Sequence, residues 1–205
     1  MCGIVGIYLK TKKFEKNLGK MLSGMLNNME SRGPDSAGFA IYKNEKKDIF
    51  KYSLCLNDLN FKNFKKEISN KIKKIQLSQH ADHVILKTPI EPKIVIKIIN
   101  KNFPEVSIVG FGHSIEIFKQ VGNPKDVVKK FKLESFSGTH GIGHTRMATE
   151  SAITTDGSHP YSTGRDECLV HNGSLSNHNN LRRELVKKGN IFNSENDTEV
   201  AAGYV

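Results

Sequence analysis

The chain has no apolar run close to the roughly 18 residues that a membrane-spanning helix needs. Residues 1–10 also lack the basic start and long apolar stretch of a signal peptide. These two absences exclude the usual sequence signals for membrane insertion and export. We therefore expect a soluble, cytoplasmic protein with no membrane partner.

Cysteine is scarce, and the three present, Cys2, Cys55 and Cys168, form no CxxC pair. Three cysteines with no close pair indicate neither a disulfide framework nor a cysteine-rich zinc site. His140 and His144 are four residues apart, but they fall in a segment with strand character, where that spacing does not mean one helical face. We expect no metal and no cofactor.

The charge is strongly basic, with 31 Lys and Arg against 21 Asp and Glu and a net charge of +10. Clustered basic residues can neutralise nucleic-acid phosphates. Here the lysines are spread through residues 43–132 among Asn and Ile, and no helix-turn-helix, RNA-binding or finger pattern accompanies them. We interpret the charge as a solvated surface and expect no nucleic-acid partner.

The 205 residues fit one domain with a single hydrophobic core. Apolar patterning predicts strands at residues 2–9, 38–42, 106–109, 114–121, 139–146 and 167–171, the first of them buried on both faces. Helical spacing predicts helices at residues 16–29, 57–75, 126–133 and 179–188, the last ended by Gly189, and a further helix with Asp197 or Thr198 near its N-cap. The pattern does not decide whether residues 84–87 and 93–99 form strands or helices.

Cys2 directly follows the initiator methionine. Taken alone, a cysteine there is more simply a buried core residue. Methionine is removed when the second residue is small, however, so Cys2 can become a mature N-terminus with both a thiol and a free amine. Those two groups suffice as nucleophile and base, because ordinary thiols and α-amines have similar pKa values of about 8.

Six motifs then occur in one order: MCGIVGIY, SRGPDSAG, GHTRMATES, SHPY, VHNGSLSNH and NDTE. In this the chain resembles the class II, N-terminal-nucleophile glutamine amidotransferases, which release ammonia from glutamine for a second site. The resemblance covers residues 1–42 and roughly 108–205. The order and spacing from HGIGHTRMATES to SHPYSTG look most like the stand-alone glutamate-synthase-type amidotransferase subunits, including those of N-methylglutamate synthase.

The resemblance implies an α+β fold, a four-layer αββα sandwich of two antiparallel sheets between helical layers. Relative to compact members of the family, about residues 44–107 are inserted and should form an extra α/β segment. Family members add strands after the NDTE helix, so we expect the domain at residues 1–205 to be incomplete at its C-terminal end, with an uncovered sheet edge.

The resemblance also assigns the chemistry. It implies that Cys2 attacks the glutamine side chain and that the Asn172 amide and the Gly173 backbone N–H bind the negative oxygen of the tetrahedral intermediate. An ordinary hairpin turn is the alternative for Asn172-Gly173.

The same comparison implies a binding site for the amino-acid end of glutamine. Arg146 would hold the α-carboxylate through two parallel bonds, Thr149 would support it, and Asp197 would bind the α-ammonium. A surface salt bridge remains the alternative for Arg146, and a helix cap the alternative for Asp197.

Supporting roles fall to other motif residues. Arg32, Gly33 and Asp35 would hold the loop facing the N-terminal strand, while His159 and His171 would hydrogen-bond the loops of the site. Glucosamine-6-phosphate synthases read HTRWATH where this chain has Met147 and Glu150, so the pocket rim should differ.

The function expected is glutaminase activity, which converts L-glutamine to glutamate and ammonia through a Cys2 glutamyl thioester. The ammonia would pass to a synthase partner of the glutamate-synthase or N-methylglutamate-synthase type. Two alternatives stay open: another N-terminal-nucleophile amidohydrolase, and an inactive, truncated regulatory relative.

Overall fold

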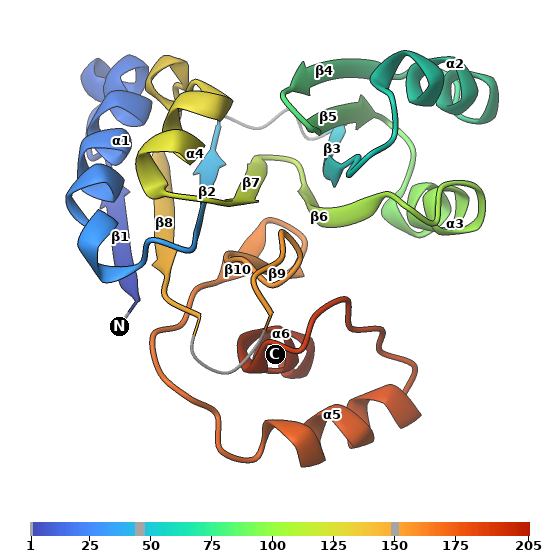
Figure 1. The fold of residues 1–205 in the computed structure, drawn as a ribbon. Coiled ribbons are helices and arrows are strands. Elements are labelled where there is room, and N and C mark those ends of the chain that lie inside the picture. The colour runs from blue at the N-terminus through green and yellow to red at the C-terminus, as the bar shows by residue number, and fades with distance from the viewer. Residues whose placement is uncertain (1, 44–47, 149–151) are drawn as a thin grey trace.

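The computed structural model describes residues 2–43, 48–148 and 152–205. Over these residues the chain forms two four-stranded antiparallel sheets, one two-stranded sheet and six α-helices. The two larger sheets lie side by side, and α5 and α6 lie below them in the view of Figure 1. The predicted α+β class with antiparallel sheets is confirmed, and the four-layer N-terminal-nucleophile sandwich stays a prediction.

The first sheet joins the first three motifs of the series. Its strand order is β1-β8-β2-β7, formed by β1 (Gly3–Tyr8), β8 (His140–Arg146), β2 (Ser36–Tyr42) and β7 (Ile115–Val121). Because Gly3 pairs with Thr145, Cys2 comes to the end of β8, where Arg146 stands. The sheet register therefore brings the predicted nucleophile and the predicted carboxylate ligand to one edge.

Two helices cover one face of this sheet, α1 (Leu18–Asn28) and α4 (Pro124–Phe131). Short 3₁₀ helices flank them, η1 (Lys12–Asn17), η2 (Glu30–Arg32) and η3 (Leu133–Ser135). Their apolar residues pack on the sheet in a buried cluster that includes Leu22, Leu26, Phe39, Phe118 and Phe131. This cluster fixes the sheet from which the site projects.

The expectation that β1 is buried on both faces is wrong. β1 lies at the edge of its sheet, and its burial alternates, with Ile4 42% and Tyr8 73% exposed. An edge strand pairs on one side only, and among the described elements α1 packs against β1. The apolar pattern gave the strand correctly but not its place in the sheet.

The second sheet comes from the central third of the chain. Its order is β4-β5-β3-β6, formed by β4 (Gln76–His80), β5 (His83–Thr88), β3 (Phe50–Cys55) and β6 (Ser107–Gly112). With α2 (Phe61–Lys71) and α3 (Pro92–Asn102) it encloses a separate cluster that includes Tyr52, Leu54, Phe64, Leu86 and Ile99. The described part of the segment predicted as an insertion thus folds around its own apolar core.

Residues at the N-terminal ends of α2 and α3 explain where these helices begin. The helix predicted at residues 57–75 is shorter because the Asn60 side chain caps α2 by accepting from the N–H groups of Lys62 and Asn63. Residues 93–99 are helical, because Pro92 occupies the first turn of α3, where its missing N–H costs nothing.

The C-terminal part contains the two-stranded sheet of β9 (Tyr161–Gly164) and β10 (Glu167–Leu169), followed by α5 (His178–Lys187) and α6 (Asp197–Tyr204). The two helices contact each other, and α6 also contacts β9. Gly189 follows α5 with a φ of +96°, a left-handed conformation that favours glycine. Residues 171–177 and 190–196 form the loops that lead into the two helices.

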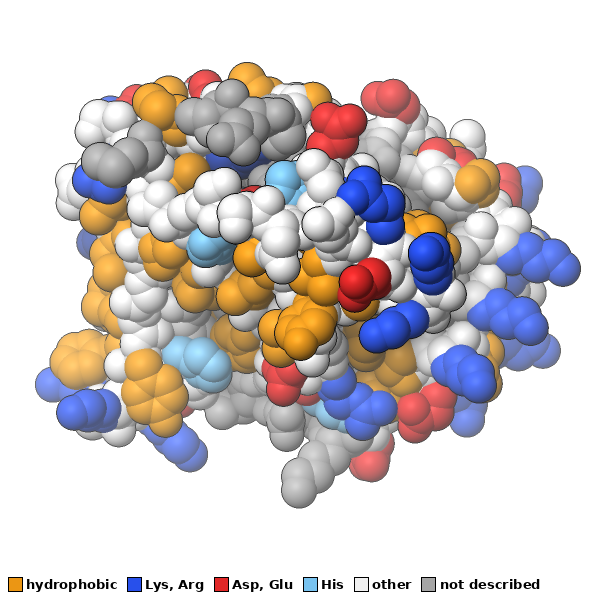
Figure 2. Space-filling model, turned by 90° about the horizontal axis from the view of Figure 1, so that it is seen from below, with side chains coloured by type: hydrophobic (Ala, Val, Ile, Leu, Met, Phe, Trp, Pro, Cys, Tyr) orange, Lys and Arg blue, Asp and Glu red, His pale blue; other side chains and the backbone are white. Residues whose placement is uncertain are grey.

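No described helix combines the length and apolar character needed to cross a bilayer. On the face drawn in Figure 2, Lys and Arg side chains gather toward the side on which α2 and α3 lie in Figure 1, with hydrophobic side chains exposed nearer the middle. The positive charge is therefore uneven over this face.

Candidate active site

A cavity of about 480 Å³ lies where the N-terminus, the end of β8 and the start of α6 meet. Its lining includes the predicted site residues Cys2, Arg146, His159, His171, Asn172, Gly173 and Asp197. Thr149, predicted to support the substrate carboxylate, lies outside the described residues. Every other predicted catalytic and substrate-binding residue lines this one cavity.

This cavity is not the larger of the two candidates. A larger cavity of about 1200 Å³ lies between the loop before β6 and the end of α6, lined among others by Phe103, Gly110 and Gly203. None of the predicted site residues lines it. The smaller cavity is the better candidate because nucleophilic, cationic and anionic side chains converge there.

The backbone of Cys2 is held from two sides. Its carbonyl oxygen accepts a hydrogen bond from Asn172 Nδ2 at 3.0 Å and from Arg32 Nε at 3.3 Å. Its Sγ lies 3.8 Å from the carbonyl oxygen of Met147. Two segments far apart in the sequence therefore fix the start of β1 at the cavity that Cys2 lines.

Arg146 ends β8 and is only 4% exposed. Its carbonyl oxygen accepts from the N–H of Asp35 at 3.1 Å, and its Nη1 donates to the carbonyl oxygen of Ala152 at 3.1 Å. A guanidinium carries five N–H donors in a fixed plane. Strand pairing and these bonds hold the buried cation in the cavity wall.

Asp197 is the first residue of α6, where the helix dipole favours negative charge. Its Oδ2 accepts from the N–H of Leu175 at 2.7 Å, and its Oδ1 accepts from Thr198 Oγ1 at 3.2 Å. The helix cap itself is Asn196, whose side chain accepts from the N–H of Thr198. The carboxylate thus ties the start of α6 to the loop that carries Asn172.

Three histidines lie together at the cavity wall, and two of them, His159 and His171, line the cavity. The rings of His144 and His159 stack with centroids 4.0 Å apart, and His144 Nε2 lies 3.0 Å from the carbonyl oxygen of His171. Burial lowers the pKa of His144 to about 4 and that of His159 well below its usual range. Both rings are therefore neutral near pH 7. His171 Nδ1 lies 3.3 Å from Thr198 Oγ1. The prediction that His159 hydrogen-bonds the loops is wrong, because neither of its buried ring nitrogens has a hydrogen-bond partner among the described residues, and its ring is held by stacking on His144.

The SRGPDSAG loop packs closely against β8. Asp35 Oδ2 accepts from the N–H of Ala148 at 2.8 Å. A Cβ added to Gly33 would lie 2.4 Å from the carbonyl carbon and oxygen of Thr145, so the close approach requires glycine. At Gly173 a Cβ would lie 2.8 Å from His171 Nε2, a side-chain atom of the same loop. The absent side chain of Gly33 lets its loop approach the backbone of β8.

Comparisons with known proteins identify the family. The model of the glutamine amidotransferase domain matches residues 133–204. The glutamine amidotransferase-like protein GlxB of Rhizobium meliloti is 47% identical over 211 aligned positions, which cover all of this chain and 69% of that protein. The chain belongs to the glutamine amidotransferase family.

Partial matches support its placement in class II. The glutamine–fructose-6-phosphate aminotransferase of Methanococcus maripaludis is 37% identical over 53% of this chain and 19% of that protein. The corresponding enzyme of Bradyrhizobium diazoefficiens is 42% identical over 43% of this chain and 14% of its own length.

Two residues that hold this amidotransferase site were not foreseen. Lys119, buried on β7, donates from Nζ to the carbonyl oxygens of Asp156 and Ser158 at 3.0 and 2.9 Å. Asn196 Nδ2 donates to the carbonyl oxygen of Gly157 at 3.1 Å. Together they anchor the loop that leads into His159. An Asn before a helix is a recognisable cap signal, whereas one lysine among many carries none.

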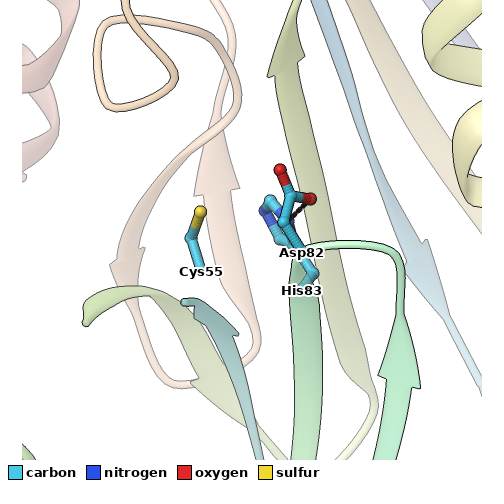
Figure 3. A group of neighbouring side chains, drawn as sticks. All are labelled: Cys55, Asp82 and His83. Atoms are coloured by element: carbon cyan, nitrogen blue, oxygen red, sulfur yellow. Dashed lines mark hydrogen bonds and ion pairs between the residues drawn. The ribbon is translucent and has the colours of Figure 1, made fainter. Parts of the chain in front are cut away.

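One group in the described part of the amidotransferase could hold a metal by residue type. Ligand atoms of Cys55, Asp82 and His83 lie within 4.8 Å of one another (Figure 3). Asp82 already pairs with His83 Nδ1 at 3.0 Å and with Lys130 Nζ at 2.8 Å, and Cys55 Sγ donates to Asn57 Oδ1. These residues line no part of the Cys2 cavity, and each of the three already has a hydrogen-bond partner, Asp82 and His83 in each other and Cys55 in Asn57.

Proposed function

We propose that this domain is a glutaminase that hydrolyses L-glutamine to glutamate and ammonia with Cys2 as the nucleophile. One observation carries the proposal: a thiol, a buried guanidinium and a carboxylate from three distant parts of the chain line one cavity. Arg146 and Asp197 offer opposite charges, which match the α-carboxylate and α-ammonium of a free amino acid.

The proposed reaction follows the mechanism of an N-terminal nucleophile. The α-amine of Cys2 takes the thiol proton, and the sulfur attacks the side-chain amide carbon to form a tetrahedral oxyanion. Collapse of this intermediate breaks the C–N bond, the nitrogen takes up a proton and leaves as ammonia, and a glutamyl thioester remains on Cys2. Water then adds to the thioester, and glutamate leaves while the thiol is restored.

The oxyanion would be stabilised by Asn172 and Gly173. The Asn172 side-chain amide already lies at hydrogen-bond distance from the Cys2 backbone, and an amide group has two N–H donors. The backbone N–H of Gly173, which lines the same cavity, would be the second donor. Thr149 is proposed to assist Arg146 at the substrate carboxylate.

The ammonia is proposed to pass to a synthase partner of the glutamate-synthase or N-methylglutamate-synthase type. This proposal rests on the motif order and spacing around GHTRMATES and SHPYSTG, together with the family relationship.

A substrate panel tests the proposal against another amidohydrolase. The domain should release glutamate and ammonia in equal amounts from L-glutamine. Glutamine analogues lacking the α-ammonium or the α-carboxylate should react with kcat/KM lower by at least about a hundredfold, since each loses a charge-assisted contact. Equal turnover of all three amides would contradict a zwitterion-selective site.

A further inference from the structure

A second cavity, of about 370 Å³, lies where the end of β2 meets the β4-β5-β3-β6 sheet. Four lysines line it, Lys43, Lys51, Lys74 and Lys87, and none of the described lining residues carries a carboxylate. They come from separate places: the end of β2, β3, the loop before β4, and β5. None of them lines the cavity that contains Cys2.

Strand register brings two of these lysines directly together. Lys51 pairs with Lys87 across β3 and β5, and Lys87 pairs with Gln76 across β5 and β4. Directly opposed residues of neighbouring strands project to the same face, and like charges there repel. Lys51 is only 8% exposed, so it is not a solvated surface lysine.

The compensating negative charge is small. Glu116, 2% exposed, lies 2.5 Å from Lys43 Nζ and 3.3 Å from Lys51 Nζ. Burial by itself raises the pKa of Glu116, but Lys43, Lys51 and Lys87 hold it below its usual value. Among the described residues, Lys74 and Lys87 have no ion pair, so Glu116 is the one described carboxylate that pairs with any of the four lysines.

The backbone at the rim of the cavity adopts an energetically unfavourable conformation. Lys74 has a φ of +57°, a left-handed conformation that non-glycine residues rarely adopt. On another wall, His113 Nδ1 lies 3.1 Å from the carbonyl oxygen of Ile49, and its ring packs on Phe50 with centroids 4.3 Å apart. An uncommon backbone conformation and a fixed ring thus shape a strongly positive cavity.

We propose that this cavity binds a small, multiply charged anion of the phosphate class. Its volume lies within the range of small-molecule sites. Lysine binds phosphate oxygens as a point charge, and an anion among the four ammonium groups would turn their mutual repulsion into attraction. Lysines on two adjacent strands around one small cavity suit a compact ligand better than an extended nucleic-acid strand, which needs a positive groove.

Calorimetric titration of the full chain with inorganic pyrophosphate, at constant ionic strength, tests the proposal. Binding should be saturable, and the Lys74→Gln/Lys87→Gln double variant should weaken it at least about tenfold. The matched control is Lys66→Gln/Lys101→Gln, which removes the same charge from exposed positions on α2 and α3 and should change the Kd by less than about twofold.

Thermal unfolding at low salt without added anion gives an independent readout. The Lys74→Gln/Lys87→Gln variant should unfold at a temperature equal to or above that of the parent, because repulsion is relieved. Absence of saturable binding, or equal weakening by the control pair, would overturn the site. Citrate binding as tightly through the same lysines would overturn the phosphate assignment, and tighter binding of a single-stranded RNA oligomer would overturn the small-ligand assignment.

Discussion

The side-chain amide of Asn172 donates a hydrogen bond of 3.0 Å to the backbone carbonyl oxygen of Cys2. This contact joins the loop after β10 to the residue that precedes β1. It places the proposed oxyanion donor beside the proposed nucleophile without a shared element of secondary structure. The site is therefore assembled by tertiary contacts, and its members should be separable by mutation.

Asn172→Ala should lower kcat by about a hundred- to a thousandfold while KM changes little, because an oxyanion donor acts mainly on the transition state. Steady-state kinetics with L-glutamine measure both parameters. Asn180→Ala, on the exposed side of α5, is the control and should behave like the parent. A rise in KM equal to the fall in kcat/KM would assign Asn172 to ground-state binding instead.

Arg146→Lys should reduce kcat/KM for L-glutamine by about tenfold or more, since lysine keeps the charge but cannot form two parallel bonds to a carboxylate. The variant should also lose most of its preference for substrates with an α-carboxylate, which a merely structural arginine would not determine. Arg183→Ala, exposed on α5, is the matched control. Unchanged discrimination in Arg146→Lys would remove the carboxylate contact from the mechanism.

Gly33→Ala should lower the free energy of unfolding by about 1–3 kcal/mol, because the added methyl meets the Thr145 carbonyl at 2.4 Å. Gly24→Ala is the matched control: a Cβ there meets no atom within 4 Å, and the residue lies inside α1. That change should stabilise the fold by about 0.5–1 kcal/mol. Chemical denaturation measures both, and equal effects would contradict the close packing of the SRGPDSAG loop.

Stability should fall as the pH drops from about 6.5 toward 4. Burial lowers the pKa of His144 to about 4 and that of His159 well below the usual 6.5. Below pH 6.5 the unfolded chain therefore takes up protons that the folded rings exclude, which favours unfolding. His144→Phe should reduce this slope, leaving part of it because burial also lowers the pKa of His159 and His83.

Denaturation midpoints at a series of pH values check this prediction. A stability that is flat between pH 6.5 and 4 in the parent, or an unchanged slope in His144→Phe, would contradict neutral buried imidazoles at the cavity wall.

Local sequence signals predicted much of the secondary structure. β8 and α5 lie within one residue of their predicted limits, because regular apolar spacing and Gly189 mark them. β4 was missed because its sequence, QLSQH, has little apolar alternation. The type of residues 93–99 was left open because Ile- and Val-rich segments suit strands and buried helices alike.

Sheet order and burial could not be obtained in this way. The edge position of β1 depends on which strands pair, and that depends on residues more than a hundred positions away. The convergence on one cavity was anticipated through the order of the six motifs, whereas Lys119 could not be distinguished from the other lysines before its burial was known.

The central claim is that the α-amine of Cys2 serves as the base, which requires a chain that begins at Cys2. Intact-mass spectrometry should show the active protein without Met1, and 6-diazo-5-oxonorleucine should label Cys2 rather than Cys55 or Cys168. The decisive measurement compares glutamine hydrolysis by this form with that of a form whose N-terminus is extended by a blocked peptide. The account predicts that the extended protein loses nearly all turnover, because its Cys2 nitrogen is an amide without a basic lone pair. Full-rate hydrolysis by the extended protein would contradict the mechanism.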